Sequence, residues 1–392
     1  MRVIFVTDAP FARDIRLQRS VEALNALEGE VEVFILDQGL LVEESQELLA
    51  DKGVLCSPPV PQGGVGRYWW HVKNRLISVR AYKARARWIQ ETTTSLKPDI
   101  IHCINPFALE ACVAAARETN AQLIYEAYEY WPDYLDCLGG RIPQVLAGRL
   151  KAAEKAASKE AVCFITVSEP LSEWYQADFD IEPPLVIYNV NTADGKEVLS
   201  PSGEPLASEP LTGELSLVYS GILLKERNVD IAIRALVLTE KVHLFIQGDG
   251  PEKVHLQQIV QELNLSDKVS FIDMVPANQL VDSLKEFDLG LTLLPATSKQ
   301  MNGAVPNKVF DYVRAGLGVL SVGTAGVRSL TGIQESIRYI DMPCPNQLAA
   351  AIKEVQKKRD DLAAMKISSR ENGPLYSREE QMRKLQDVYA AL

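Results

Sequence analysis

Short apolar runs alternate with stretches of helical periodicity along the first half of the chain. Runs of strand length occupy residues 2–6, 31–36, 98–104, 122–127, 162–168 and 184–189. Helical spacing of apolar residues predicts helices at 14–27, 108–117 and 143–160. Apolar strands separated by helices predict a parallel sheet covered on both faces, with functional groups at the carboxyl ends of the strands.

The same alternation restarts in the second half. We expect strands at 215–221, 242–250, 268–274, 289–294 and 318–323. We expect helices at 228–238, 252–263, 277–285, 306–315 and 346–364, and a last one at 377–391 that begins with a capping box. Two similar halves predict an α/β protein with two Rossmann-like, doubly wound parallel-sheet domains facing a central cleft.

A segment rich in Pro, Gly, Ser and Glu separates the halves. Residues 191–214 carry almost no apolar periodicity, which is typical of a linker. The 392-residue chain also exceeds the roughly 250–300 residues at which single cores stop growing. We therefore expect domains at 1–190 and 215–372, and a C-terminal segment, 373–392, whose helix can cross back to the first domain.

Composition narrows the class of protein. The net charge of −11 disfavours generic nucleic-acid binding. The six cysteines form no C-x-x-C pair and the four histidines lack the spacing of metal ligands, so we expect no metal, no disulfide and a reducing compartment. The first apolar run is too short for a signal peptide, and no run reaches the roughly 18 residues of a membrane span, so we expect a cytoplasmic protein.

The segment VPNKVFDYVRAGLGVLSV, residues 305–322, carries the strongest chemical signal. Pro306 suits the first turn of a helix, whose N–H groups and positive dipole end favour an anion. Lys308 stands in this first turn, where a diphosphate would be stabilised. Asp311, one turn later, can accept hydrogen bonds from ribose hydroxyls. The alternative is an ordinary helix terminus with solvated charges.

Two glycine-containing turns add to this signal. In VYSGILLKERNVD, residues 218–230, a strand ends at Gly221, where the backbone can approach a ligand closely. Lys225 and Arg227 follow and could neutralise phosphate charge. FIQGDGPE, residues 245–252, forms a similar turn after the next strand. A surface turn with ordinary charges is the alternative for each.

Read in order, these motifs resemble those of the large retaining GT-B glycosyltransferase family (family 4-like) that includes sucrose synthase and bacterial polysaccharide glycosyltransferases. The matching pieces are YSGILLKER, GDGPE, FIDMVPANQLVDSLKEFDLGLTLL and VPNKVFDYVRAGLGVL, with looser matches in RVIFVTDAPFARDIRLQRSVEAL, KPDIIHCINPFAL and LIYEAYEYWPDYL. The resemblance implies a metal-independent hexosyltransferase without a permanently bound cofactor. Its donor would be a UDP- or GDP-sugar, and its acceptor a glycan, a lipid-linked sugar or another glycoconjugate, as in polysaccharide biosynthesis.

The resemblance also implies roles for single residues. Asp311 would hold the donor ribose, while Lys308 and Arg227 would contact the diphosphate. Tyr128 stands where the family has a histidine near the transferred sugar, which makes it the third catalytic candidate. The other positions expected to line the nucleotide sugar are Gly221, Lys225, Gly248, Met274, Val275, Asn302, Gly303 and Asn307.

Three positions depart from the family pattern. The family's acid eight residues before Asp311 is Gly303 here, its arginine after the strand glycine is Ile222, and its first-domain histidine is Tyr128. Asn302 and Glu129 are candidates to substitute. The departures leave a second hypothesis open, a nucleotide-sugar-binding partner subunit with impaired catalysis.

The first domain offers candidates for acceptor binding. Arg13, Asp14 and Arg16 open the first helix, although capping of that helix by Asp14 is an equal alternative. His102 is expected at a strand end, where a structural histidine is the commoner outcome. Glu129 lies in the acidic segment YEAYEYWPD, whose carboxylates also leave a glycosidase open.

The stretch 66–91 is basic within an acidic protein. It has seven lysines and arginines against one acid, with Tyr68, Trp69, Trp70 and Trp88 interleaved. This pattern predicts a helix lying on an anionic membrane surface, which would place the protein peripherally on the inner membrane face near a lipid-linked acceptor. The alternative is a solvated helix whose aromatic residues enter the core.

Overall fold

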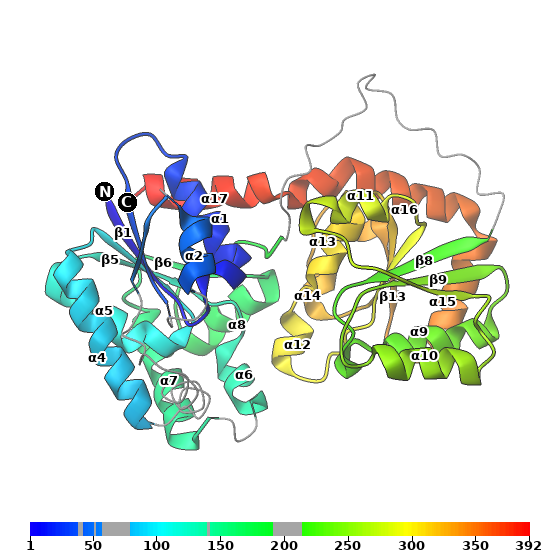
Figure 1. Cartoon of the computed structure of the whole chain (residues 1–392), viewed down its shortest axis with the longest axis horizontal. Helices are drawn as coiled ribbons and strands as arrows, with labels where there is room; N and C mark the ends of the chain where they lie inside the picture. The colour runs from blue at the N-terminus through cyan, green and yellow to red at the C-terminus, as the bar shows by residue number, and fades with distance from the viewer. Residues whose placement is uncertain (38–41, 51, 57–78, 139–141, 191–213) are drawn as a thin grey trace. The chain divides into compact units, whose positions relative to one another are not determined.

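The computed structural model describes residues 1–37, 42–50, 52–56, 79–138, 142–190 and 214–392 (Figure 1). The described chain divides into two compact units. Unit 1 comprises Met1–Asn189 with Ser298–Gln300 and Gln381–Leu392, and unit 2 comprises Val190–Thr297 and Met301–Glu380. The expected linker, 191–214, lies outside the described residues except for Glu214.

Unit 1 is built on a seven-stranded parallel sheet of order β3-β2-β1-β4-β5-β6-β7. Its strands are β1 (Arg2–Val6), β2 (Glu32–Leu36), β3 (Val54–Cys56), β4 (Ile100–Ile104), β5 (Gln122–Glu126), β6 (Cys163–Thr166) and β7 (Leu185–Val186). The chain order reverses between β1 and β4, where Phe5 pairs with His102. Such a switch point is where open α/β sheets bind ligands, beyond the carboxyl ends of the strands.

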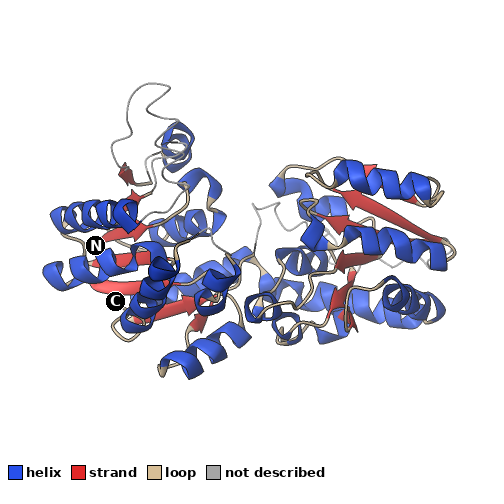
Figure 2. Cartoon of the chain, turned by 90° about the horizontal axis from the view of Figure 1, so that it is seen from below, coloured by secondary structure: helices blue, strands red, loops and turns tan. Residues whose placement is uncertain are grey.

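Helices cover both faces of this sheet, as Figure 2 shows in blue around the red strands. The helices are α1 (Ile15–Asn25), α2 (Val42–Leu49), α4 (Val79–Leu96), α5 (Leu109–Thr119), α6 (Trp131–Cys137), α7 (Gln144–Ala157) and α8 (Glu169–Phe179). One apolar core joins the sheet to α4, α5 and α7, and a second joins the other face to α1. The last helix, α17 (Arg378–Ala390), adds Leu385 and Tyr389 to this second core, beside α1 (Figure 1).

Unit 2 has a six-stranded parallel sheet of order β10-β9-β8-β11-β12-β13. The strands are β8 (Leu215–Ser220), β9 (Val242–Gln247), β10 (Val269–Ile272), β11 (Leu289–Thr292), β12 (Gly318–Val322) and β13 (Ile337–Ile340). The helices are α9 (Val229–Ala235), α10 (Lys253–Glu262), α11 (Leu280–Leu284), α12 (Lys299–Gly303), α13 (Asn307–Arg314), α14 (Ala325–Arg328), α15 (Pro345–Lys357) and α16 (Arg359–Asn372). The switch point lies between β8 and β11.

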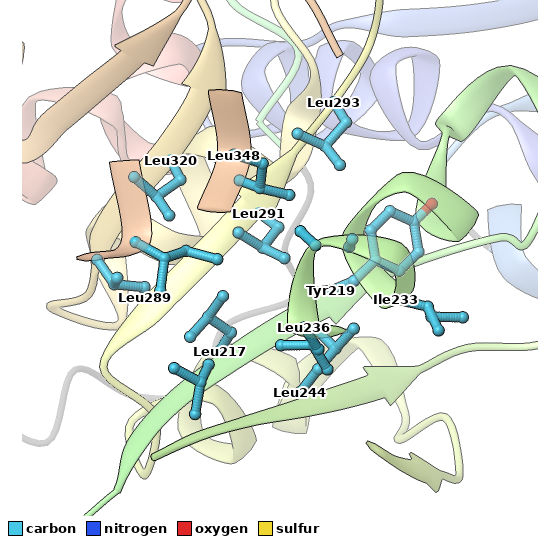
Figure 3. Packing of buried hydrophobic residues seen from close by; sticks show 14 of the residues in the cluster. Leu217, Tyr219, Ile233, Leu236, Leu244, Leu289, Leu291, Leu293, Leu320 and Leu348 are labelled. Atoms are coloured by element: carbon cyan, nitrogen blue, oxygen red, sulfur yellow. The ribbon is translucent and has the colours of Figure 1, made fainter. Parts of the chain in front are cut away.

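The apolar core of unit 2 extends to the ends of β8 and β11 at this switch point. Figure 3 shows Leu217, Leu291 and Leu320 of the strands packed with residues of α9 and α15. Each fully buried leucine contributes about 1.5–3 kcal/mol relative to an exposed one. Tyr219 belongs to the same cluster, at the end of β8, so its ring position is fixed by the core.

The structure confirms the two doubly wound parallel sheets, and it corrects several element predictions. The single helix expected at 346–364 is two helices, α15 and α16, because Lys358 leaves the helical conformation (φ −112°, ψ 72°). The short edge strands β3 and β13 and the helices α2, α6, α8, α12 and α14 were not predicted. Strand β7 has two residues, whereas the apolar run at 184–189 predicted six.

Candidate functional site

The ends of β8 and β11 are tied together by one side chain of α13. The hydroxyl of Tyr312 accepts a hydrogen bond from the Ser220 amide (3.0 Å) and donates one to the Leu291 carbonyl (3.2 Å). The ring lies against Gly290, where a Cβ would stand 2.2 Å from it. This contact fixes α13 across the switch point of unit 2.

The turn after β8 approaches the turn after β9 at glycine residues. Gly221 has φ +135°, a conformation that other residues rarely adopt. A Cβ on Gly248 would stand 2.1 Å from the Gly221 carbonyl oxygen, and one on Gly250 would stand 2.5 Å from the Leu223 carbonyl oxygen. Glycine is therefore required at both positions for the two turns to pack.

Lys308, in the first turn of α13, reaches the Gly221 turn. Its ammonium lies over the Tyr219 ring, 3.6 Å from the centroid, and 3.3 Å from where a Cβ of Gly221 would stand. Among the residues that the structure describes, no carbonyl or carboxylate accepts a hydrogen bond from it. Burial and the nearby Arg227 charge lower the pKa of Lys308 well below its usual value, against the opposing effect of Asp311.

Arg227 closes the short 3-10 turn Lys225–Arg227 that follows β8. It is half-buried, and no described side chain pairs with its guanidinium. The turn is held by Asn228, a left-handed residue (φ 53°) whose side chain donates to the Leu293 carbonyl at 2.9 Å. Arg227 and Lys308 are thus two neighbouring cations, neither of which forms an ion pair in the described part of unit 2. This arrangement favours an anion between or beside them.

Asp311 lies one turn beyond Lys308 and is buried, with 5% of its surface exposed. Burial raises its pKa to about 7, although Arg314 and Lys308 oppose this. Its Oδ1 has no hydrogen-bond partner among the described residues. A buried acceptor without a donor is costly, so a ligand hydroxyl would be favoured there.

The other expected nucleotide-sugar residues divide into two groups. Lys225 is exposed beside Arg227, Asn307 begins α13, and Met274 and Val275 follow β10, with Met274 exposed. In the second group, the Asn302 side chain accepts a hydrogen bond from the Ala325 amide at the start of α14 (2.9 Å). The Gly303 carbonyl also packs against α14, where a Cβ on Gly326 would stand 2.3 Å from it. The structure therefore ties Asn302 and Gly303 to α14.

A comparable switch point exists in unit 1, and a residue that the sequence analysis missed organises it. Asn105, directly after β4, has φ 62° and ψ 166°, a combination close to glycine-only space. Its amide donates to Asp8, which follows β1, at 3.1 Å. Its side-chain oxygen Oδ1 accepts hydrogen bonds from the Tyr128 backbone amide and from the Trp131 indole, both at 3.2 Å. A polar residue between a strand and a proline, as in Ile104-Asn105-Pro106, is the signal that could have revealed it.

The first turn of α1 faces the same region. Asp14 caps α1 by accepting from the Leu17 amide at 3.1 Å, as the capping alternative predicted, and it also accepts from the Tyr128 hydroxyl at 3.3 Å. The guanidinium of Arg16 lies over the Tyr128 ring, 3.6 Å from the centroid. Arg13 is exposed at the end of the preceding 3-10 turn.

His102 lies elsewhere than expected. It stands in the middle of β4 and is fully buried, whereas the sequence placed it at the strand end. Its ring nitrogens lie 3.1 Å from Glu126 and 2.8 Å from the Tyr389 hydroxyl of α17. Because a fully buried side chain cannot touch an acceptor, the structural alternative fits His102.

The acids at the end of β5 and after it differ in how deeply they are buried. Glu126 is fully buried beside His102 and Arg19, which leaves it no exposed oxygen for a substrate. Glu129 is half-buried, and burial raises the pKa of its carboxyl group. Glu126 is therefore not available as one of the paired carboxylates that a glycosidase needs.

The basic stretch is only partly described, since residues 66–78 lie outside the described residues. In its described part, within α4, Tyr82 is buried and Trp88 packs against the same core. Arg85 donates to the Thr7 carbonyl after β1 at 2.8 Å. These aromatic residues therefore face inward, as the alternative to membrane binding expected.

Among the residues that the structure describes, no helix is both long and apolar enough to cross a membrane. No group of three or more His, Cys, Asp or Glu side chains within the same ranges could hold a metal ion.

Comparison with known proteins identifies both halves. Residues 14–190 match the family model of a glycosyl transferase 4-like domain, and residues 207–372 match that of glycosyl transferases group 1. A comparison with curated proteins finds no match.

Solved structures with the same fold include sucrose-phosphate synthase from Thermosynechococcus elongatus, with 14% identity, a TM-score of 0.69, and 100% of this chain and 98% of that chain covered. Anabaena HepE in complex with UDP gives 14% identity and a TM-score of 0.69 with both chains fully covered. The lipopolysaccharide outer core galactosyltransferase WaaB gives 15% and 0.63, again with both chains fully covered. The two family matches span most of the sequence, and the chain belongs to the glycosyltransferases of the GT-B fold.

Proposed function

We propose that this chain transfers a sugar from a nucleotide-diphosphate sugar, which unit 2 holds at its switch point. One observation carries the proposal. Lys308 and Arg227 lie together at the Gly221 turn, and neither forms an ion pair with a carboxylate among the described residues. The lack of side chains at Gly248 and Gly250 lets the two turns pack closely, which holds the Gly221 turn beside Lys308.

The donor fits these groups in a definite order. The diphosphate would lie against the start of α13, where Lys308 and Arg227 balance its charge. A ribose hydroxyl would donate to the carboxylate of Asp311, a residue that keeps 5% of its surface exposed. UDP is the nucleotide in the HepE complex, and UDP-glucose is the donor in another structure of that protein, which makes a UDP-sugar the first donor to test.

The same cations would serve the chemical step. When the bond between the anomeric carbon and the diphosphate oxygen breaks, negative charge grows on the leaving diphosphate. Fixed cations stabilise this charge more in the transition state than in the ground state, which is the condition for catalysis. The motif resemblance supports transfer of a hexose with retention of anomeric configuration and without a bound metal.

The acceptor would bind in unit 1, around Asp14, Arg16 and Tyr128. We infer a glycan, glycolipid or other glycoconjugate, as in polysaccharide assembly. The departures from the family pattern at Gly303, Ile222 and Tyr128 motivate the alternative, a binding subunit with impaired catalysis, which the family matches do not favour. Turnover of a donor separates the two, because a binding subunit would bind a nucleoside diphosphate and release no sugar with any acceptor.

Peripheral membrane binding remains a separate proposal that rests on the charge of residues 66–91. Co-sedimentation with liposomes that contain anionic lipid tests it. Binding that weakens as salt rises supports the proposal, and the absence of such binding contradicts it.

A thermal-shift panel tests the donor site. A ligand at 100 times its Kd stabilises the folded state by about 2.7 kcal/mol. We expect UDP, or else GDP or ADP, to raise the melting temperature, and the matching nucleoside without phosphates to raise it far less. A protein that none of the three diphosphates stabilises would contradict the proposed function.

A further inference from the structure

Arg16 combines a fixed position with unused hydrogen-bonding capacity. Its guanidinium lies over the Tyr128 ring, with Cζ 3.6 Å from the centroid. Within the described ranges, no carbonyl or carboxylate makes a hydrogen bond or an ion pair with it. Stacking on a ring occupies the face of the guanidinium and leaves its N–H groups, which lie in the plane, free to bind a ligand.

The acids around Arg16 have other partners. Asp14 accepts hydrogen bonds from the Leu17 amide and the Tyr128 hydroxyl. Asp8 accepts from Asn105. These carboxylates influence Arg16 through space, but none of them occupies its N–H groups.

Glu126 is likewise committed, since it lies in the interior of unit 1 between His102 and Arg19. The charge of Arg16 also acts on Glu129, whose carboxylate accepts a hydrogen bond from the Gln300 side chain. The unit thus contains an arginine whose neighbouring carboxylates each interact with another group. An arginine without an ion pair of its own is expected to bind an anionic group of a ligand favourably.

The platform beneath Arg16 is rigid. The Tyr128 amide donates to Asn105 at 3.2 Å, and its hydroxyl donates to Asp14. Tyr128 follows β5 by two residues, and Arg16 stands in the first turn of α1, the helix that follows β1. Both therefore lie near the switch point of unit 1. Binding to such a preformed group costs little ordering of the protein.

The planar fork of arginine matches the two oxygens of a carboxylate or a phosphate. We propose that Arg16 binds an oxyanion carried by the acceptor, so that the acceptor is an acidic or phosphorylated sugar. This inference rests on the proposed function, because it takes unit 1 to hold the acceptor. The carboxylate of a uronic acid and the phosphate of a sugar phosphate supply the same chemistry, and the experiment separates them.

Three ligands that differ only at the sixth carbon test the idea: glucose, glucuronate and glucose 6-phosphate. Their binding is measured by calorimetry in a buffer without phosphate. For the wild-type chain we expect at least one anion to bind roughly tenfold or more tightly than glucose. Arg16→Gln abolishes this preference, whereas Arg16→Lys keeps part of it as a point charge. Arg87→Gln, a change at an exposed arginine of α4, leaves the preference intact.

The outcomes divide clearly. Equal binding of all three sugars, no saturable binding of either anion, or a preference that survives in Arg16→Gln would overturn the inference. The UDP thermal shift is measured on the same variants. If Arg16→Gln removes that shift, the anion at Arg16 belongs to the donor, and the acceptor assignment is wrong. If UDP fails to stabilise even the wild type while the anion preference holds, the proposed donor site fails and the Arg16 site stands.

Discussion

Replacing Lys308 by methionine should have opposite effects on stability and on nucleotide binding. Methionine keeps the apolar stem and can contact the Tyr219 ring through sulfur, but it removes the charge. In the free protein this charge is desolvated, close to Arg227, and without a hydrogen-bond acceptor among the described residues. Its pKa is lowered, so the folded state disfavours the charged form.

The sign of the stability effect follows from this shift. A lysine whose folded pKa lies below its unfolded value binds fewer protons when folded, so it destabilises the protein at all pH values below the folded pKa. This cost disappears as pH rises to the unfolded value. Lys308→Met should therefore leave the stability at pH 7 unchanged or raise it, apart from about 0.5–2 kcal/mol of lost cation–π contact.

Binding should change in the other direction. A hydrogen bond to a charged group contributes about 1.5–3 kcal/mol, which corresponds to roughly a 10- to 150-fold weaker Kd for UDP. Calorimetry with UDP and urea unfolding without ligand measure the two effects. Lys353→Met, at an exposed lysine of α15, is the control and should change neither. A variant that keeps UDP affinity within about twofold, or that loses affinity only because the free protein unfolds, would refute the reasoning.

Three further predictions concern the same unit. The pKa of Asp311 is raised in the folded state, so its protonated form stabilises the fold below the unfolded pKa, and this stability is lost as pH rises through the folded pKa. Asp311→Asn should therefore flatten the fall in the free energy of unfolding between pH about 4 and about 7. Urea titrations at several pH values check this, and an unchanged pH dependence would oppose it. Gly248→Ala should cost about 1–3 kcal/mol, since its Cβ would meet the Gly221 carbonyl, and should weaken UDP binding; wild-type stability would contradict the packing. Tyr312→Phe should lower the free energy of unfolding by about 1–3 kcal/mol, because it leaves the Ser220 amide without its acceptor. Urea unfolding measures this loss as well.

The sequence predicted the buried strands well for a physical reason. A strand covered on both faces is a continuous apolar run, so β1, β8 and β12 stand out with nearly correct bounds. The edge strands β3 and β13 are only three and four residues long and partly exposed, and their assignment depends on pairing that only the fold provides.

The helix of Lys308 and Asp311 was also predictable, because Pro306 and the residue spacing are local signals. What the sequence could not supply were the contacts between distant residues. The partners of His102 include Tyr389, 287 positions away, so its burial was not visible. The same holds for the tie from Tyr312 to Ser220 across 92 positions.

Asn105 illustrates a further limit. Its left-handed backbone is sustained by bonds to Asp8, Tyr128 and Trp131, which three different elements position. The residue type alone indicates only a turn, so its place at the centre of the unit 1 switch point required the structure.

A crystal structure with UDP, or with whichever nucleoside diphosphate stabilises the protein most, tests the central claim most directly. We predict diphosphate oxygens within hydrogen-bond distance of Lys308 Nζ and the Arg227 guanidinium, and a ribose hydroxyl on Asp311. A nucleotide bound away from the Gly221 turn, with Lys308 still lying on the Tyr219 ring without a ligand, would contradict the account.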